Sequence, residues 1–529
     1  MREADWQFLL PRAEAGVFRH LLLLGGSPAL GGHVGELGIA NRVSRSPGRG
    51  APADLVVVLA DAGISIDSLA PHIADDAVLY VEVDRRQPGR RMLTPRRTMR
   101  MLAAHGFTNS TAYWVEPGFP RREMYLPFGR RGALRSYLDA MYRPPSCGRR
   151  LLKSAMKTLT QHDAMFAAMA PCYAIISARG MTLRPPALVE QACGPGDEAA
   201  EPVLLAAGDT DASRLVFLLF DGHAERPSAV LKLARAVTFN DAVEREHAVL
   251  RDVAAMVSDA LLPSIPPCTL LRAGDRLLTA EGCITGIPVA SRSGASASAA
   301  LDDLRCVTAW LTSFHRETTC GHVDATDWVA HELVGRLSAE YEALFGVTAA
   351  RQRLFDVARR SADADMGELP IVWQHMDFGP WNIYREGAQV SVIDWKSARR
   401  GPALADLLYF VLHWSAAVHG CETRGQRIQH FESLFCAPLS TDATGRAIDA
   451  QLSAYMHAVG VAPALLPHVL LYTVLAHAVG RARLLQRTGR ALSRDTVVNE
   501  YIGDVDVLAR HQDLLFQRTR LQGVAYATG

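Results

Sequence analysis

The stretch from Ile371 to Tyr384, "IVWQHMDFGPWNIY", holds His375, Asp377 and Asn382 at short, fixed offsets. The run "VSVIDW" then places Asp394 at the end of an apolar, strand-like segment. Phosphoryl transfer needs a carboxylate that orients a hydroxyl group and oxygen ligands for a divalent metal. This set therefore predicts a loop that binds magnesium, with Asp377 as the base. The alternative is a polar turn at a strand end, which would be the better interpretation for either motif alone.

A buried lysine upstream tests this idea. The chain has only four lysines among 56 basic residues, yet Lys232 lies inside the apolar run "SAVLKLAR". A buried ammonium needs a partner, and Glu246 in the helical run "DAVEREHAVLRDVAAMV" is a suitable one. Such a pair would aim the ammonium at phosphate oxygens. The alternative is a lysine that reaches solvent from an edge strand. Either Asn240 or Asp241 can cap the predicted helix.

Three motifs carry a resemblance to a known family. "HMDFGPWN", "VIDW" and "GPALADLLYFV" resemble the aminoglycoside phosphotransferase and choline kinase family over roughly residues 201–529. The resemblance implies an α+β fold with two lobes, as in protein kinases. The N-lobe would span residues 201–289 and the mainly helical C-lobe residues 290–529. The segment "ASRSGASASAA" (290–300) would join them.

The same resemblance implies a role for each site residue. Asp377 would be the catalytic base and His375 would support its loop, while Asn382 and Asp394 would bind Mg²⁺. Lys232 would hold the phosphates of ATP, and Glu246 would fix Lys232.

Two further segments would contact the nucleotide. Backbone groups from Glu281 to Cys283, in "LTAEGCITGIPV", match the family's hinge to adenine, and Ser213 in "GDTDASR" is a possible phosphate contact. That turn has one glycine, Gly208, and ordinary turn chemistry explains it equally well. Asp406 falls at a structural aspartate of the family and receives no catalytic role.

Protein kinases fit less well than this family. "WKSARRGPALAD" follows Asp394 as a short path to the next helix, without a long activation segment or an APE-like element. The histidine of the loop is followed by Met-Asp rather than Arg-Asp. Both features favour a small-molecule kinase.

The acceptor is not expected to be a polycation. Aminoglycosides need acidic walls, but residues 401–529 hold 10 acidic and 11 basic residues. We therefore expect an uncharged hydroxyl-bearing acceptor, such as a sugar, an amino alcohol or a glycan end.

Residues 1–182 predict a separate α/β domain. "HLLLLGG", "LVVVLADA" and "AVLYVEV" alternate with helix-like stretches, as in a parallel sheet, and residues 183–200 read as a linker. The order resembles a Rossmann-like class I S-adenosylmethionine-dependent methyltransferase, in which Gly25, Gly26 and Asp61 would line the cofactor pocket. However, the loop is "GGSPALGG", not GxGxG, and "ANRVSRS" ends without the acidic residue that would bind ribose. These departures favour a degenerate domain.

The run "DRRQPGRRMLTPRRTMR" carries seven arginines between Arg85 and Arg100. Such a run could recognise phosphates or an anionic polymer. A solvated loop and helix face is the more common explanation. Aromatic residues are sparse within it, so we do not expect nucleic-acid binding.

Composition sets the wider limits. A chain of 529 residues is too long for one core, and its nine cysteines form no CxxC pair, which suits a reducing compartment. The beginning "MREADWQFLLPRAEAG" does not resemble a signal peptide. The longest apolar run, "PALLPHVLLYTVLAHAVG", is too short to span a bilayer comfortably. We therefore expect a cytoplasmic protein without a membrane span.

The sequence thus predicts an ATP- and Mg²⁺-dependent phosphotransferase with an accessory N-terminal domain. One alternative is a bifunctional methyltransferase-kinase that modifies a glycan. The other is a catalytically silent binding protein of kinase shape. ATP versus GTP, S-adenosylmethionine binding and oligomeric state stay open at this point.

Overall fold

The computed structural model divides the chain into two compact units. Unit 1 comprises Met1–Glu244 with Cys268–Cys283, and unit 2 comprises Arg245–Pro267 with Ile284–Gly529. The structure describes residues 2–11, 17–48, 50–63, 66–119, 121–138, 158, 163–183, 185–193, 202–206, 208, 213–221, 224–292, 296–362, 366–436, 442–487 and 499–516. Each unit is described separately below.

Unit 1 begins with a parallel sheet. Its strands lie in the order β2 (Ala40–Ser44), β1 (Phe18–Leu24), β3 (Ala53–Val58) and β4 (Ile73–Asp84). Alternate residues of β1 enter two different hydrophobic clusters, so apolar side chains cover both faces of this sheet. A strand buried on both faces needs a continuous apolar sequence. This confirms the three parallel strands predicted from "HLLLLGG", "LVVVLADA" and "AVLYVEV".

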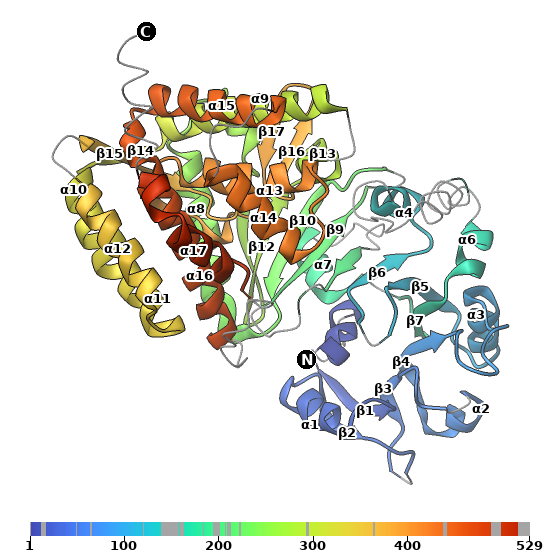
Figure 1. Ribbon diagram of the computed structural model, residues 1–529. Coiled ribbons are helices and arrows are strands. Elements are labelled where there is room, and N and C mark those ends of the chain that lie inside the picture. The colour runs from blue at the N-terminus through green and yellow to red at the C-terminus, as the bar shows by residue number, and fades with distance from the viewer. Residues whose placement is uncertain are drawn as a thin grey trace. The chain divides into compact units, whose positions relative to one another are not determined.

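Short helices connect the strands of unit 1 (Figure 1). They are η1 (Arg2–Leu9), α1 (Pro28–Glu36), α2 (Ile66–Leu69), η2 (Ala70–His72), α3 (Pro95–Ala104), α4 (Arg131–Ser136), α6 (Asp163–Met169) and α7 (Ala187–Cys193). The sequence determines where helix α3 begins. The Thr94 side chain caps the helix by accepting a hydrogen bond from the Arg97 N–H group, and Pro95 follows in the first turn. Helix α7 occupies part of the predicted linker, of which residues 184 and 194–200 lie outside the described residues.

The sheet of unit 1 then continues with antiparallel strands. They are β7 (Cys172–Ala178), β5 (Asn109–Glu116), β6 (Met124–Pro127), β8 (Val203–Leu205), β9 (Arg214–Leu219), β10 (Ala229–Ala234), β12 (Arg276–Gly282) and β11 (Cys268–Ala273). All belong to one 12-stranded sheet, in the order β11-β12-β10-β9-β8-β6-β5-β7-β4-β3-β1-β2. The expected N-lobe strands on either side of "GDTDAS" are present as β8 and β9, with β10 following.

The division between the two compact units does not lie at the predicted domain boundary near residue 200. Met124 of β6 pairs with Leu205 of β8, and Tyr125 pairs with Leu204. The predicted N-lobe strands therefore extend the sheet of the predicted N-terminal domain. The backbone ladder between β6 and β8 joins the two sets of strands into one sheet.

Unit 2 contains two small sheets that carry the chemically interesting residues. One has the order β13 (Ile287–Pro288), β16 (Ile383–Glu386) and β17 (Gln389–Val392). The other has the order β14 (Thr319–Asp324), β15 (Glu368–Gln374) and β18 (Arg399–Pro402). His375 follows β15 directly, and Asp394 lies two residues after β17.

The remainder of unit 2 is mainly helical, as predicted (Figure 1). After α8 (Asn240–Ala254), which crosses the division between the units, come η5 (Leu262–Ser264), η6 (Val289–Arg292), α9 (Ala297–Glu317), α10 (Ala325–Trp328), η7 (Val329–Leu337), α11 (Ser338–Phe345), α12 (Ala349–Ser361), η9 (Trp395–Ser397), α13 (Ala405–Val418), α14 (Arg424–Phe435), α15 (Ala443–Val459), η10 (Pro463–Leu465), α16 (Leu466–Arg487) and α17 (Tyr501–Arg510). Part of the predicted joining segment 290–300 is the first turn of α9, capped by Ser296.

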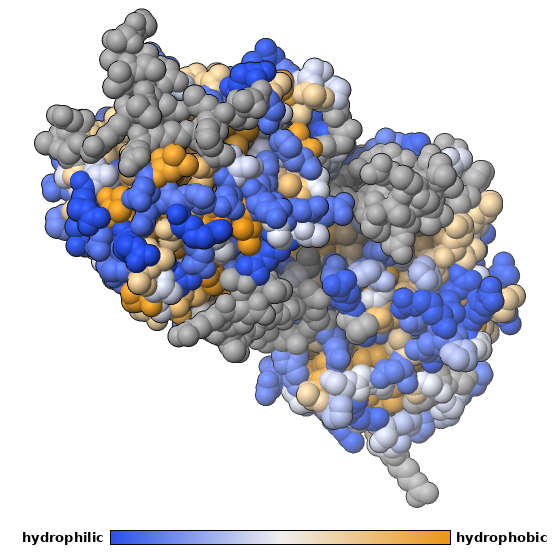
Figure 2. Space-filling model, viewed as in Figure 1, coloured by the Kyte–Doolittle hydropathy of each residue, from blue (hydrophilic) through white to orange (hydrophobic). Residues whose placement is uncertain are grey.

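The longest apolar helix has the burial of a core helix. The helical segment Pro463–Arg487 is long and apolar enough to cross a membrane, although its sequence had suggested too short a run. Of its most apolar 18-residue window, 72% is buried inside the protein. Figure 2 shows hydrophilic side chains spread over the visible face of each unit, with hydrophobic side chains in small groups between them.

Candidate active site

The loop between β15 and β16 holds His375 and Asp377 in a fixed relation. The Asp377 backbone N–H donates to His375 Nδ1 over 3.3 Å, and His375 Nε2 lies 2.9 Å from the carbonyl oxygen of Ile393. Because a carbonyl oxygen can only accept, Nε2 carries the proton and Nδ1 is the acceptor. The buried imidazole, 1% exposed, thus ties the loop to the residue immediately before Asp394.

Asp406 fixes the same loop from the start of helix α13. Its carboxylate accepts from the backbone N–H groups of His375 (2.6 Å) and Met376 (3.0 Å), and it lies 3.6 Å from His315 Nε2. Burial by itself raises the pKa of Asp406, but the His315 partner and the backbone donors leave that pKa below its usual value. The ionised Asp406 therefore holds Met376 at a φ of 63°, a strained conformation for a residue with a side chain.

The Asp377 carboxyl is positioned and partly shielded from solvent. Burial raises the pKa of Asp377 and nearby Asp394 adds to the rise, whereas His375 and Lys396 oppose it. The Tyr409 hydroxyl donates to Asp377 Oδ1 over 3.3 Å. A carboxylate with a raised pKa whose orientation is fixed by a hydroxyl donor is a suitable general base.

Asn382 and Asp394 offer the hard oxygen ligands that Mg²⁺ prefers. The Asn382 Nδ2–H group donates to the Asp377 carbonyl oxygen over 2.9 Å, which leaves its Oδ1 atom as an acceptor. The Asp394 carboxylate forms an ion pair with Lys396 Nζ at 2.6 Å. An anion that attracts an ammonium also attracts a metal cation, so the donor set fits magnesium. Within the described part of the chain, no group of three or more His, Cys, Asp or Glu residues could hold a metal ion.

In unit 1, Lys232 pairs with a residue other than the one predicted. Its Nζ atom lies 2.7 Å from Glu281 Oε2, and the two side chains are 10% and 3% exposed. Lys232 is opposite Thr279 in the β10–β12 ladder, so Glu281 is its diagonal neighbour on the same face. Glu246 is fully buried and belongs to unit 2. Its pairing with Lys232 stays a prediction.

The predicted adenine contacts need a correction at Glu281. This residue lies inside β12 between Val230 of β10 and Cys268 of β11, so its backbone groups face neighbouring strands. Its function in the structure is that of a side-chain partner for Lys232. Cys283, immediately after the end of β12, is free of this constraint and stays a candidate.

The predicted phosphate turn is described only at its ends, because residues 209–212 lie outside the described residues. Gly208 has a φ of 89°, and a Cβ atom there would lie 2.5 Å from Ser213 Oγ. The two ends of the turn are therefore in close contact. The buried guanidinium of Arg235 donates to the carbonyl oxygens of Gly208 (3.3 Å) and Ala206 (3.1 Å).

The structure brings Gly25, Gly26 and Asp61 together, but it fills their hydrogen-bonding positions. Gly26 N–H donates to Asp61 Oδ1 over 2.9 Å, and a Cβ atom on Gly25 would lie 2.4 Å from the same oxygen. Arg45, immediately after β2, donates to the carbonyl oxygens of Gly25 and Gly26 at 2.6 and 2.9 Å. Arg45 thus lies directly after β2, where the methyltransferase resemblance requires an acidic residue.

Three of the seven arginines between Arg85 and Arg100 form hydrogen bonds or ion pairs within the protein. Arg85 donates to the carbonyl oxygens of Ala170 and Arg91. Arg86 forms an ion pair with Asp84 at 2.8 Å, and Arg90 donates to the Ala60 carbonyl oxygen. The other four arginines lie at exposed positions of the loop and of α3. This distribution favours the solvated-surface interpretation over a dedicated anion site.

Sequence reasoning missed several residues near Asp377. Tyr409 of helix α13 bonds Asp377, Tyr501 of helix α17 bonds Tyr409, and no local pattern marks either tyrosine. Two signals were available: Lys396 is one of only four lysines, and Trp381 is a large aromatic residue between a Gly-Pro turn and Asn382. Both lie within five residues of a predicted magnesium ligand.

Comparison with known proteins supports the class of chemistry. Residues 207–435 match the family model described as "Phosphotransferase enzyme family". This segment contains Lys232, Asp377 and Asp394, and residues 1–206 lie outside it. Comparison with curated protein sequences finds no match.

Several solved structures are similar over much of their length. A thermostable mutant of aminoglycoside phosphotransferase APH(4)-Ia in its apo form is 15% identical, with a TM-score of 0.37, covering 63% of this chain and 98% of that one. A choline/ethanolamine kinase family protein from Mesorhizobium loti is 15% identical, with a TM-score of 0.36 and coverage of 63% and 95%. An amicoumacin kinase is 12% identical, with a TM-score of 0.32 and coverage of 56% and 86%.

The family match supports an enzyme that transfers a phosphoryl group to a hydroxyl, as the catalytic stretch predicted. The matched family concerns the segment from the predicted phosphate turn to helix α14. The family match does not include residues 1–182, and their methyltransferase resemblance stays a prediction.

Proposed function

We propose that the protein transfers the γ-phosphoryl group of ATP to a hydroxyl group of a small molecule or sugar. The observation that carries the proposal is the Asp377 loop, in which His375 and Asp406 fix the backbone and Tyr409 holds the carboxyl. The family match over residues 207–435 supports the same chemistry.

Each residue then has a defined task. Asp377 accepts the proton of the acceptor hydroxyl as the new bond to phosphorus forms. Lys232, oriented by Glu281, binds phosphate oxygens of the nucleotide. Asn382 and Asp394 would hold Mg²⁺, which when bound neutralises charge on the phosphates. Lys396 would release Asp394 to the metal.

We further propose that the part of unit 1 spanned by residues 1–182 has an accessory, structural role. Its parallel sheet and glycine turn agree with a methyltransferase ancestry. However, Asp61 and Arg45 already bond the turn that would hold S-adenosylmethionine. A working methyltransferase is therefore the less favoured alternative.

The decisive experiment measures phosphate transfer from Mg-ATP to a panel of neutral sugars, amino alcohols and aminoglycosides. Asp377→Asn should lose about 10²–10⁴-fold in turnover, because it removes the base, while the nucleotide Kd changes little. Addition of a chelator should abolish transfer by the unsubstituted enzyme.

Asp356→Asn is a matched control. It removes a carboxylate on α12 that accepts a hydrogen bond from Gln352 over 3.3 Å. Its turnover should equal that of the unsubstituted protein. Near-normal turnover of Asp377→Asn would show that the base is wrongly assigned, and failure to bind Mg-ATP would contradict the whole proposal.

A further inference from the structure

Trp381 is the exposed tryptophan of this protein. The structure describes all eight tryptophans, and Trp381 is 39% exposed whereas each of the other seven is at most 9% exposed. It lies four residues after Asp377, in the loop that also holds Asn382. A single exposed apolar residue is ordinary, but its position beside the proposed base requires an explanation.

Packing holds the indole ring in one place. A Cβ atom on Gly379 would lie 2.3 Å from the Trp381 ring, so the ring rests against the loop's own backbone. Its centroid lies 5.1 Å from the His413 ring at 67° and 6.2 Å from the Tyr409 ring at 84°. These edge contacts fix the ring and leave part of it open to solvent.

A chain of hydrogen bonds connects this aromatic group to the proposed base. Tyr501 donates to the Tyr409 hydroxyl over 3.3 Å, and Tyr409 donates to Asp377 Oδ1 over 3.3 Å. His413 Nε2 lies 3.4 Å from the Tyr501 hydroxyl. Trp381, whose ring contacts Tyr409, is therefore linked through Tyr409 to the proposed base Asp377.

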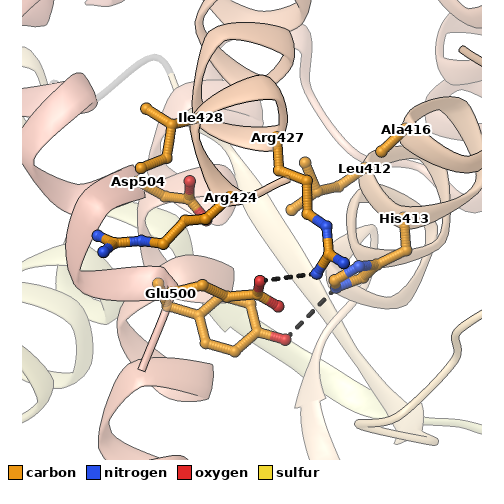
Figure 3. A pocket seen from close by; sticks show the side chains of 9 residues that line it. Leu412, His413, Ala416, Arg424, Arg427, Ile428, Glu500 and Asp504 are labelled. Atoms are coloured by element: carbon orange, nitrogen blue, oxygen red, sulfur yellow. Dashed lines mark hydrogen bonds and ion pairs between the residues drawn. The ribbon is translucent and has the colours of Figure 1, made fainter. Parts of the chain in front are cut away.

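The ionisable groups behind these rings include two arginines, Arg424 and Arg427, and two carboxyl groups, Glu500 and Asp504. A small pocket there is lined by His413, Arg427, Glu500, Tyr501 and Asp504, with four other residues (Figure 3). Arg427 pairs with Glu500 at 3.0 Å. Burial raises the pKa of Asp504 to about 8, and the neighbouring Arg424 opposes this rise.

The histidines of the group are uncharged at neutral pH. Burial lowers the pKa of His413 to about 4 and that of His477, which stacks on Tyr409, to about 3. The aromatic wall thus presents apolar faces and neutral hydrogen-bonding groups. None of its residues, Trp381, Tyr409, His413, His477 and Tyr501, carries a carboxylate that would pair with a protonated amine.

We propose that Trp381, Tyr409, His413 and Tyr501 form the acceptor subsite and select an uncharged, hydroxylated ring that stacks on Trp381. The inference rests on the proposed phosphotransferase function. A rigid aromatic face binds the C–H surface of such a ring at little cost in side-chain entropy. The ring's hydroxyl groups can then bond the neutral polar atoms at its edge. Tyr409 acts as a positioning residue, because its hydroxyl fixes the orientation of the Asp377 carboxyl.

Tryptophan fluorescence tests the platform without requiring turnover. Acrylamide should quench a small accessible component of the emission, and Trp381→Phe should remove that component. Methyl glycosides should protect the component, whereas choline and kanamycin should not. Protection by choline or kanamycin alone, or by none of these probes, would overturn the proposal.

Kinetics test the two roles separately. Trp381→Ala should raise the acceptor KM about tenfold with an unchanged KM for ATP, and Trp381→Phe should restore most of the loss. Tyr409→Phe should lower kcat and move the acidic limb of the pH–rate profile to higher pH, because the ionised Asp377 loses a hydrogen bond. A merely structural Tyr409 would leave that limb in place.

The outcomes distinguish the two proposals. If the unsubstituted protein transfers phosphate but Trp381→Ala leaves every acceptor KM unchanged, the acceptor subsite is wrong and the proposed function stands. If no hydroxyl compound is phosphorylated and Mg-ATP does not bind, the proposed function is wrong. The quenching result would then decide by itself whether neutral rings bind at Trp381.

Discussion

At the scale of single residues, the environment of Asp377 predicts a particular pH dependence. Burial raises its pKa, and a carboxyl group accepts a proton only when it is ionised. Transfer should therefore be fastest above this raised pKa and should be lost as the pH falls through it. Measurement of kcat/KM between about pH 4 and 9 checks this expectation.

The control for this pH profile is nucleotide binding over the same range. Since Asp377 acts on the hydroxyl and not on the nucleotide, the Kd of Mg-ATP should stay constant where the rate falls. A rate that stays flat down to about pH 4 would contradict a base with a raised pKa.

The sequence predicted the residues of the catalytic loop better than it predicted their partners. His375, Asp377 and Asn382 lie within eight residues, and this short spacing carries its own chemical meaning. Tyr409 comes 32 residues after Asp377, and Tyr501 a further 92 residues later. Their proximity depends on how helices α13 and α17 pack, which no local pattern encodes.

At the scale of elements, strand register explains why the ion pair between Lys232 and Glu281 was not predicted. The apolar pattern correctly predicted a strand around Lys232 and a helix around Glu246. It could not predict that β12 returns beside β10 with Glu281 on the face of Lys232, because register depends on the hairpin as a whole. Glu281 was therefore predicted to contact adenine through its backbone, whereas its carboxylate forms an ion pair with the Lys232 ammonium group.

The N-terminal helix η1 contributes a second element-scale contact that the sequence did not reveal. Asp5 pairs with Arg235 through bonds of 2.8 and 2.9 Å, and both side chains are at most 2% exposed. Arg235 in turn holds the carbonyl oxygen of Gly208 at the predicted phosphate turn. A residue near the start of the chain thus supports a turn some 200 positions later.

Asp5→Ala should therefore destabilise the protein strongly. It removes the buried carboxylate partner of the Arg235 guanidinium, and loss of one partner of a buried ion pair typically costs about 3–5 kcal/mol. We expect a clear fall in Tm, measured by thermal unfolding, and a higher KM for ATP because the turn loses its support. An unchanged Tm would contradict the importance of this ion pair.

Asp76→Ala provides the matched control. Asp76 also pairs with an arginine, Arg19, at 2.9 Å, but both side chains are more than 60% exposed. Exposed ion pairs are screened by solvent and contribute little. The Tm of this variant should stay close to that of the unsubstituted protein, so the comparison isolates the effect of burial.

At the scale of the whole molecule, the continuous sheet of unit 1 changes the meaning of the N-terminal segment. Composition and motif spacing separated residues 1–182 from 201–289, because a linker-like sequence stands between them. In the structure β6 and β8 pair, so the strand that carries Lys232 belongs to the same sheet as the parallel strands. The parallel part can therefore act as support for the predicted nucleotide-binding strands without binding a cofactor of its own.

This interpretation predicts which of two ligands stabilises the protein. Mg-ATP should raise the Tm, since a ligand at 100 times its Kd contributes about 2.7 kcal/mol to the native state. S-adenosylmethionine should leave the Tm unchanged, because Asp61 and Arg45 already bond the glycine turn that would receive it. Arg45→Ala tests whether Arg45 blocks this turn, because the substitution frees the Gly25 and Gly26 carbonyl oxygens. The measurement is the Tm of each protein with and without each ligand. Saturable stabilisation of the unsubstituted protein by S-adenosylmethionine would show that the parallel part holds a working cofactor site and would favour the bifunctional alternative.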